Sequence, residues 1–192
     1  MGFTRAELES FRGATVPDLV GPGLRLLFVG INPGLWTAAT GTHFAHPGNR
    51  FYPALRAAGI IDRDIDRTGG MSGADRQALM AQGIGITNLV TRATSKASEL
   101  TRGELRAGGE RLRRFVVEHR PVVVAVAGVT AYRDAFGARH AKLGRQDEGF
   151  GVAGEYVAEL WVVPNPSGLN AHETIASLAT AYAAPACAAG LL

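Results

Sequence analysis

Leu26-Leu27-Phe28-Val29-Gly30-Ile31-Asn32-Pro33-Gly34 begins with an apolar run and ends in a loop, which is the pattern of a buried strand of a parallel sheet and the turn after it. The pattern returns far along the chain, where residues 160–163 are apolar and Asn165-Pro166-Ser167-Gly168-Leu169-Asn170 follows. Ligands of open α/β sheets bind beyond the carboxyl ends of the strands. We therefore expect the two Asn-Pro loops to face each other across one crevice and to carry the function.

Strands and helices alternate along the rest of the chain. Apolar, β-branched runs predict further strands at 84–90 and 122–127, and an extra strand or hairpin arm at 150–157. Helical spacing and capping residues predict helices at 5–12, 50–58, 72–83, 101–119 and 130–136. These elements predict one domain over residues 1–192, a three-layer α/β/α sandwich with a mainly parallel central sheet, in which residues 1–23 form a peripheral N-terminal segment.

Three local expectations concern how elements begin and end. Residues 35–49 are expected to form a polar loop, and Thr130 to cap the helix that follows the 122–127 strand. Asn170-Ala171-His172-Glu173 has the spacing of a capping box, so the last helix is expected to begin there. Pro185 is expected to end that helix at residue 184.

Composition limits the functional classes. The apolar residues, 46% of the 192, form no run near the ~20 residues that a membrane span needs, and charges stand where a signal peptide has its apolar core. The one cysteine, Cys187, excludes an internal disulfide, so we expect a cytoplasmic protein. A net charge of +3 permits DNA binding without establishing it. The six arginines between Arg102 and Arg120 are interpreted as a solvated helix face with internal ion pairs.

Several common chemistries are missing from the sequence. It has no Gly-x4-Gly-Lys-Ser/Thr phosphate loop, no dinucleotide fingerprint after a strand and no Gly-x-Ser-x-Gly elbow. His43 and His46 are close together but lack further ligands, so we expect neither a metal nor a cofactor. What remains is an amide side chain, an aromatic ring and backbone donors, a set suited to binding a planar polar ring and orienting a water molecule.

Four motifs occur in one order along the chain: Gly30-Ile31-Asn32-Pro33-Gly34, Ala45-His46-Pro47-Gly48-Asn49-Arg50-Phe51, Thr87-Asn88-Leu89-Val90 and Asn165-Pro166-Ser167-Gly168-Leu169. Together they resemble the mismatch-specific uracil/thymine-DNA glycosylases of the uracil-DNA glycosylase superfamily, from about residue 26 to the last helix. The resemblance implies a partner, duplex DNA with a mismatched or damaged base. It also implies a reaction, in which the base is flipped out and its N-glycosidic bond is hydrolysed.

The resemblance assigns roles in the base pocket. Asn32 matches the asparagine that positions the attacking water; the alternative is an ordinary turn cap before Pro33. Phe44 matches the residue that stacks on the flipped base, and the backbone amides of Ile31, Phe44 and Ala45 would contact its oxygens. His46 and Asn49 support this loop or act directly. Asn88 either reads a base edge or ends its strand in a turn.

The second loop matches the segment that enters the duplex. Leu169 would fill the gap left by the flipped nucleotide, unless it instead packs as a staple on the last helix. Asn165, Ser167 and Gly168 would contact phosphate and the orphaned base. Asn170 stands where serine is common in the family, which leaves the contacts to the opposite base open. No lysine lies in these motifs, so the expected chemistry is monofunctional hydrolysis that leaves an abasic site.

Two other functions fit parts of this pattern. A non-catalytic protein that binds damaged DNA would keep Phe44 and the wedge but would not need Asn32. An enzyme of free nucleosides or nucleotides would not need an apolar wedge, and would favour a phosphate loop. The substrate that we expect is uracil opposite guanine, with thymine or etheno-cytosine as further candidates. The chain length and the lack of a coiled-coil pattern fit a monomer.

Overall fold

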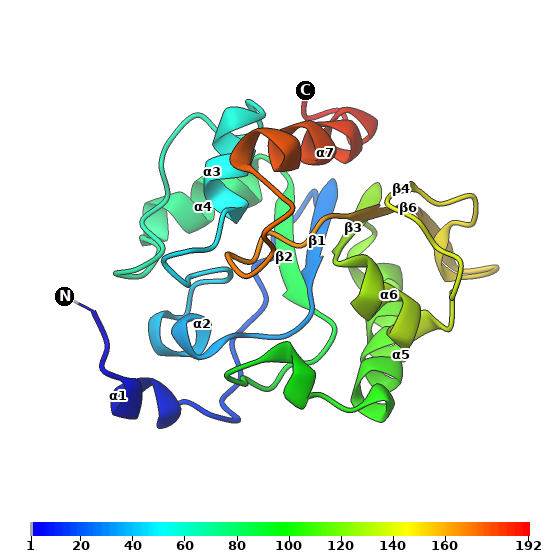
Figure 1. Cartoon of the computed structure of the whole chain (residues 1–192). Helices are drawn as coiled ribbons and strands as arrows, with labels where there is room; N and C mark the ends of the chain where they lie inside the picture. The colour runs from blue at the N-terminus through cyan, green and yellow to red at the C-terminus, as the bar shows by residue number, and fades with distance from the viewer. Residues whose placement is uncertain (1) are drawn as a thin grey trace.

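The computed structural model describes residues 2–192. Its central sheet has six strands, of which five follow the order β2-β1-β3-β6-β4, and the sixth, β5, pairs with β6 (Figure 1). Four of the strands form the parallel part of the sheet: β1 (Leu26–Gly30), β2 (Ile84–Asn88), β3 (Val123–Ala127) and β6 (Tyr156–Val163). Each pairs in parallel with the strand next to it in this group. The short strands β4 (Gly144–Arg145) and β5 (Phe150–Val152) pair with β6 antiparallel. Since Gly30 pairs with Asn88 and Ala127 with Val163, the four parallel strands end at the same edge.

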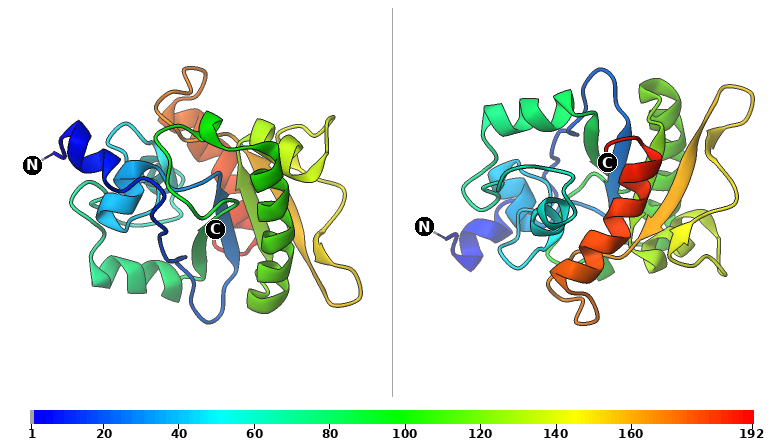
Figure 2. Two further views of the ribbon diagram at one scale, coloured as in Figure 1. Left: turned by 90° about the horizontal axis from the view of Figure 1, so that it is seen from below. Right: turned by 90° about the horizontal axis from the view of Figure 1, so that it is seen from above.

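Helices cover both faces of the sheet. The chain places α3 (Phe51–Ala57), α4 (Gly73–Ala81) and α7 (Ile175–Ala188) on one face, and α5 (Arg102–His119) and α6 (Val129–Phe136) on the other (Figures 1 and 2). Alternate residues of β1 enter the two cores: Phe28 packs with the first group of helices, and Leu27 and Val29 with the second. The predicted three-layer α/β/α fold with a mainly parallel sheet is therefore confirmed.

Helix α5 approaches the end of β2 closely because it has a glycine at the contact. A Cβ atom on Gly108 would lie 2.2 Å from the carbonyl oxygen of Leu89.

Two of the arginines of α5 also turn inward, so the interpretation of all six as a solvated face was wrong. Arg111 donates to the carbonyl oxygen of Asn88, and Arg113 lies 4.8 Å from the ring centre of Phe150. Among the described helices, none has the length and apolar character of a membrane span.

Several of the expected helix boundaries were wrong. Helix α2 (Leu35–Thr40) lies within the expected polar loop, and α6 begins one residue early, after Gly128, with no side-chain cap. The last helix begins at Ile175, where Thr174 accepts a hydrogen bond from the backbone N–H of Ser177, so 170–173 form no capping box. Pro185 lies inside this helix, where it costs one hydrogen bond of the last turn while its ring is buried.

The N-terminal segment, which we expected to be peripheral, is tied to the sheet. After α1 (Arg5–Glu9), the backbone of Ala93 donates to Ala14 and accepts from Gly13. Further on, Leu19 and Ile86 exchange two backbone hydrogen bonds. The segment therefore pairs with β2 and with the loop after it, next to the carboxyl ends of the strands.

Candidate active site

One cleft of about 920 Å³ lies at the edge where the parallel strands end. It brings together nearly all the site residues predicted from the sequence: its walls include Ile31, Asn32, Phe44, Asn88, Asn165, Ser167, Gly168, Leu169 and Asn170, as well as His46 and Asn49. Ala45 is fully buried and does not lie on the cleft wall, so the structure does not bring it together with the other predicted site residues. All five asparagines of the chain line this cleft.

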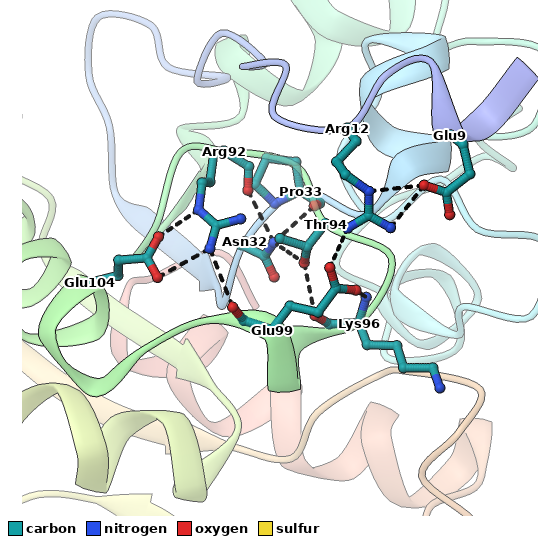
Figure 3. Close-up of polar contacts among 9 residues, drawn as sticks. All are labelled: Glu9, Arg12, Asn32, Pro33, Arg92, Thr94, Lys96, Glu99 and Glu104. Carbon is teal, nitrogen blue, oxygen red and sulfur yellow. Dashed lines mark hydrogen bonds and ion pairs between the residues drawn. The ribbon is translucent and has the colours of Figure 1, made fainter.

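The side chain of Asn32 has a defined orientation. The two N–H groups of its amide are shared among three acceptors: the carbonyl oxygens of Pro33 and Arg92, both 3.1 Å from Nδ2, and Oγ1 of Thr94 at 2.8 Å (Figure 3). Carbonyl oxygens accept hydrogen bonds and cannot donate them, so the –NH2 group must be on this side. The Oδ1 atom is therefore on the opposite side, where no described residue donates to it, and it is free to accept a hydrogen bond from water.

The loop that holds Asn32 is itself braced. Thr94, which is 1% exposed, donates through Oγ1 to the carbonyl oxygen of Lys96 at 2.9 Å. The Arg92 side chain donates to Glu104 at 3.1 Å, and this contact, together with hydrogen bonds from Thr101, lowers the pKa of Glu104 to about 2. Figure 3 shows how these contacts surround Asn32. The hydroxyl group of Thr94 and the residue that supplies the Arg92 carbonyl group are thus themselves held by polar contacts.

The N-terminal segment supports this loop from outside. Arg12 forms ion pairs with Glu99 and with Glu9, the latter at 2.8 Å. Glu99 ends the short 3-10 helix η1 (Ala97–Glu99) and accepts a hydrogen bond from the backbone N–H of Lys96 at 2.7 Å. Two further residues of the segment and of α2, Leu8 and Trp36, line the cleft.

Phe44 presents an aromatic ring to the cleft. One face of the ring stacks on Phe51, with ring centres 4.1 Å apart, and Phe51 is fully buried. The backbone of Phe44 has a φ of 57°, a conformation that is uncommon outside glycine and is often found at functional sites. A Cβ atom on Gly30 would lie 3.4 Å from the Phe44 ring and 2.4 Å from Oδ1 of Asn88, so glycine keeps the space between them open.

His43 fixes the orientation of the Asn88 amide. Nε2 of His43 lies 3.0 Å from the carbonyl oxygen of Pro17 and must donate to it, which leaves Nδ1 to accept from Nδ2 of Asn88 at 3.2 Å. Burial lowers the pKa of His43 and keeps the ring neutral. Asn88 therefore keeps one N–H and its Oδ1 for a ligand, on the wall of the cleft.

The second Asn-Pro loop forms the opposite rim. Its turn is held by Asn165, whose Oδ1 accepts from the backbone N–H of Ser167 at 2.9 Å and whose carbonyl oxygen accepts from Nδ2 of Asn170 at 3.1 Å. Leu169 at its tip is 90% exposed, so it is not a hydrophobic staple on the last helix. The rim thus presents one large apolar side chain to the solvent.

Sequence reasoning missed part of the site. Thr94 and Arg92 follow the Thr87–Val90 motif closely, but nothing in their residue types marks a role. Lys96, which we placed in a polar loop, lies on the cleft wall, with its ammonium group directed away from Asn32 (Figure 3). No aspartate or glutamate lines the cleft, and the described residues hold no group of three or more potential metal ligands of the His, Cys, Asp and Glu types.

Comparisons with known proteins indicate the family and the fold. The family model described as the uracil DNA glycosylase superfamily matches residues 17–184. The solution NMR structure of a protein from Methanosarcina acetivorans, described as a candidate uracil DNA glycosylase, is similar in fold, with a TM-score of 0.60. The two sequences are 18% identical, and the match covers 94% of this chain and 98% of that chain.

Proposed function

The chain belongs to the uracil DNA glycosylase superfamily, and on this premise we propose that it is a monofunctional glycosylase that releases uracil opposite guanine from duplex DNA. Thymine and etheno-cytosine are further substrates to test. The observation that carries the proposal is the orientation of Asn32, whose amide nitrogen is engaged on three acceptors while Oδ1 is left for water. The proposed product is DNA with an abasic site, which then enters base-excision repair.

The proposed reaction begins when the nucleotide leaves the base stack and its base enters the cleft against the free part of the Phe44 ring. The bond between C1′ and N1 of the base breaks, and its electron pair leaves with the base as an anion. Backbone N–H groups of the Ile31 and Phe44–Ala45 loops would stabilise that charge. Water then adds to C1′ of the oxocarbenium-like sugar and releases its proton to the medium.

Asn32 orients this water but cannot take its proton, because an uncharged amide is not a base at neutral pH. No carboxylate lines the cleft to do so instead. The departure of the base therefore has to come before the attack of water. We infer a slow turnover compared with a glycosylase that has a carboxylate at this position.

Asn88 is proposed to read the edge of the base. With one N–H engaged by His43, it offers the other N–H and Oδ1 side by side. Uracil and thymine present a matching O4 acceptor and N3–H donor, whereas cytosine presents a donor and an acceptor in the opposite order. A buried mismatch of this kind leaves polar groups unpaired, which favours uracil and thymine over cytosine.

The test is single-turnover cleavage of a duplex with one G·U mismatch, without added metal, by the wild type and by Asn32→Ala. We expect uracil release by the wild type and a loss of at least about tenfold in the variant, since a single oriented polar group at a reacting centre is typically worth that much or more. Gln146→Ala is the matched control, because it also removes an amide, one that bonds to Lys142 and Gly144 outside the cleft.

Other outcomes point to other functions. If wild type and variant bind mismatched duplexes but cut none containing uracil, thymine or etheno-cytosine, the protein is a damage-binding module. If the wild type hydrolyses free deoxyuridine in preference to DNA, it is a nucleoside hydrolase. If Asn32→Ala cuts as fast as the wild type, another residue positions the water.

A further inference from the structure

Arg50 connects the two sides of the cleft. It precedes α3, yet its guanidinium donates to carbonyl oxygens of the opposite rim: those of Ser167 and Asn170, both at 2.7 Å, and that of Glu173. Its backbone N–H donates to the carbonyl oxygen of Pro166 at 3.0 Å. Four hydrogen bonds from this one residue thus end on residues 166–173.

Residues 166–173, which we call the wedge segment, are otherwise held by local turn contacts, among them those of Asn165 with Ser167 and Asn170. The segment lies between the end of β6 and the first residue of α7, Ile175, and contains neither helix nor strand. Leu169, at its tip, is almost fully exposed. At one further point the segment touches the facing loop backbone to backbone, since a Cβ atom on Gly168 would lie 2.6 Å from the carbonyl oxygen of Gly48.

The chemistry of arginine suits this position. A guanidinium has five N–H donors in a rigid plane, so one side chain can bond to several carbonyl oxygens at once, and hydrogen bonds from a charged donor are about twice as strong as neutral ones. Lysine has a single ammonium group and cannot span the same set. No described carboxylate forms an ion pair with Arg50. Its two terminal nitrogens donate to carbonyl groups of the wedge segment, while its Nε is buried without a partner.

From these contacts we infer that Arg50 is a positioning residue for the insertion of Leu169 into the duplex. It holds the wedge segment in the conformation in which this side chain can enter. The inference rests on the proposed function and deepens it, because it couples the loop of Phe44, which receives the base, to the loop that fills the gap. Arg50 touches neither the base nor the water in this account. Its effect on the reaction passes through Leu169.

A double-mutant cycle tests this coupling. Cleavage of the G·U duplex below saturation, and binding of the product duplex with an abasic-site analogue, are measured for the wild type, Arg50→Gln, Leu169→Ala and the double variant. We expect each single variant to lose about tenfold or more, since charged hydrogen bonds and an inserted apolar wedge each contribute at this scale. In the Leu169→Ala background, Arg50→Gln should cost less than about twofold, because coupled residues are not additive.

Matched variants separate positioning from general stability. Arg67→Gln removes another arginine that donates to a backbone carbonyl, that of Pro47 in the facing loop, and it should leave both readouts close to the wild type. Arg50→Lys should recover part of the loss, since an ammonium can keep some of the contacts. If thermal denaturation shows that Arg50→Gln does not fold, Arg50→Lys takes its place in the cycle.

The inference is overturned if the losses of Arg50→Gln and Leu169→Ala multiply in the double variant, or if Arg67→Gln is as impaired as Arg50→Gln. It is also overturned if Arg50→Gln cleaves and binds like the wild type. A wild type that cuts no mismatched duplex refutes the proposed function instead, and the product-duplex binding cycle still decides whether Arg50 acts through Leu169.

Discussion

Replacing Thr94 with valine tests whether the orientation of Asn32 controls the reaction. The two side chains have nearly the same shape, so the change removes the hydroxyl of a residue that is 1% exposed without opening a cavity. Asn32 loses the shortest of its three contacts, at 2.8 Å, and the Lys96 carbonyl oxygen loses its donor. A net hydrogen bond contributes about 0.5–1.5 kcal/mol, and if that orienting energy is lost in the transition state the rate falls by about 2- to 13-fold.

The loss should be smaller than that of Asn32→Ala. The carbonyl oxygens of Pro33 and Arg92 still require the –NH2 group on their side, so the amide of the Thr94→Val variant is loosened and not reversed. The measurement is the single-turnover rate on the G·U duplex at saturating enzyme, with Thr94→Ser as the control that keeps the hydroxyl. A Thr94→Val rate equal to that of the wild type, or an equal fall in Thr94→Ser, refutes the reasoning.

Three further predictions concern stability. Gly108→Ala should lower the free energy of unfolding by about 1–3 kcal/mol in chemical denaturation, because the added Cβ would overlap a backbone carbonyl oxygen. Gly103→Ala, on the open side of α5, should instead raise the free energy of unfolding by up to about 1 kcal/mol. Hydrogen bonds from Arg92 and Thr101 lower the pKa of Glu104 to about 2, so these contacts stabilise the fold above the ordinary carboxyl pKa and are lost as pH falls toward 2. The melting temperatures of Glu104→Gln and wild type should therefore differ at pH 7 and converge near pH 2. Burial lowers the pKa of His43, so the unfolded chain binds the proton first and the stability of the fold decreases as pH drops below about 6.5. Chemical denaturation at pH 7.5 and 5.5 should show this decrease in the wild type and a smaller one in His43→Gln. Equal decreases in the two proteins would contradict a buried, neutral His43.

The layers of the fold were predictable because the strands carry their signal locally. Runs such as 26–29 and 122–127 are apolar and β-branched, and the helix α5 shows both a capping box and helical spacing. The start of the last helix was not predictable in the same way, since two capping patterns compete, one that begins at Asn170 and one that begins at Thr174. Arg50 engages the carbonyl oxygens of Asn170 and Glu173, which keeps 170–173 in turns and leaves the cap to Thr174. The choice between the two caps thus depends on Arg50, which is more than a hundred positions away in the sequence.

The site residues were predictable where they lie in loops that follow strands. They were not predictable where the contacts of the site are made by backbone groups. Asn32, Asn88 and Asn165 each stand at or just after the end of a parallel strand, so register alone brings them to one edge. The acceptors of Asn32 are different in kind. Two of them are carbonyl groups, which every residue has, and the third belongs to Thr94 in a polar stretch where threonine is unremarkable. Only the path of the chain after β2 reveals them.

That path also explains why an amide, and not a carboxylate, suits this position. The carbonyl oxygens of Pro33 and Arg92 carry partial negative charge and lie 3.1 Å from Nδ2 of Asn32, so a carboxylate here would place a full negative charge against both. The positions of these carbonyl groups follow from the ends of β1 and β2, and Arg92 is further held by Glu104. An aspartate could be accommodated only if the loops moved or the acid stayed protonated. On the proposed mechanism, the geometry of the sheet edge therefore commits the enzyme to bases that depart readily as anions, because nothing at position 32 can deprotonate the water that follows.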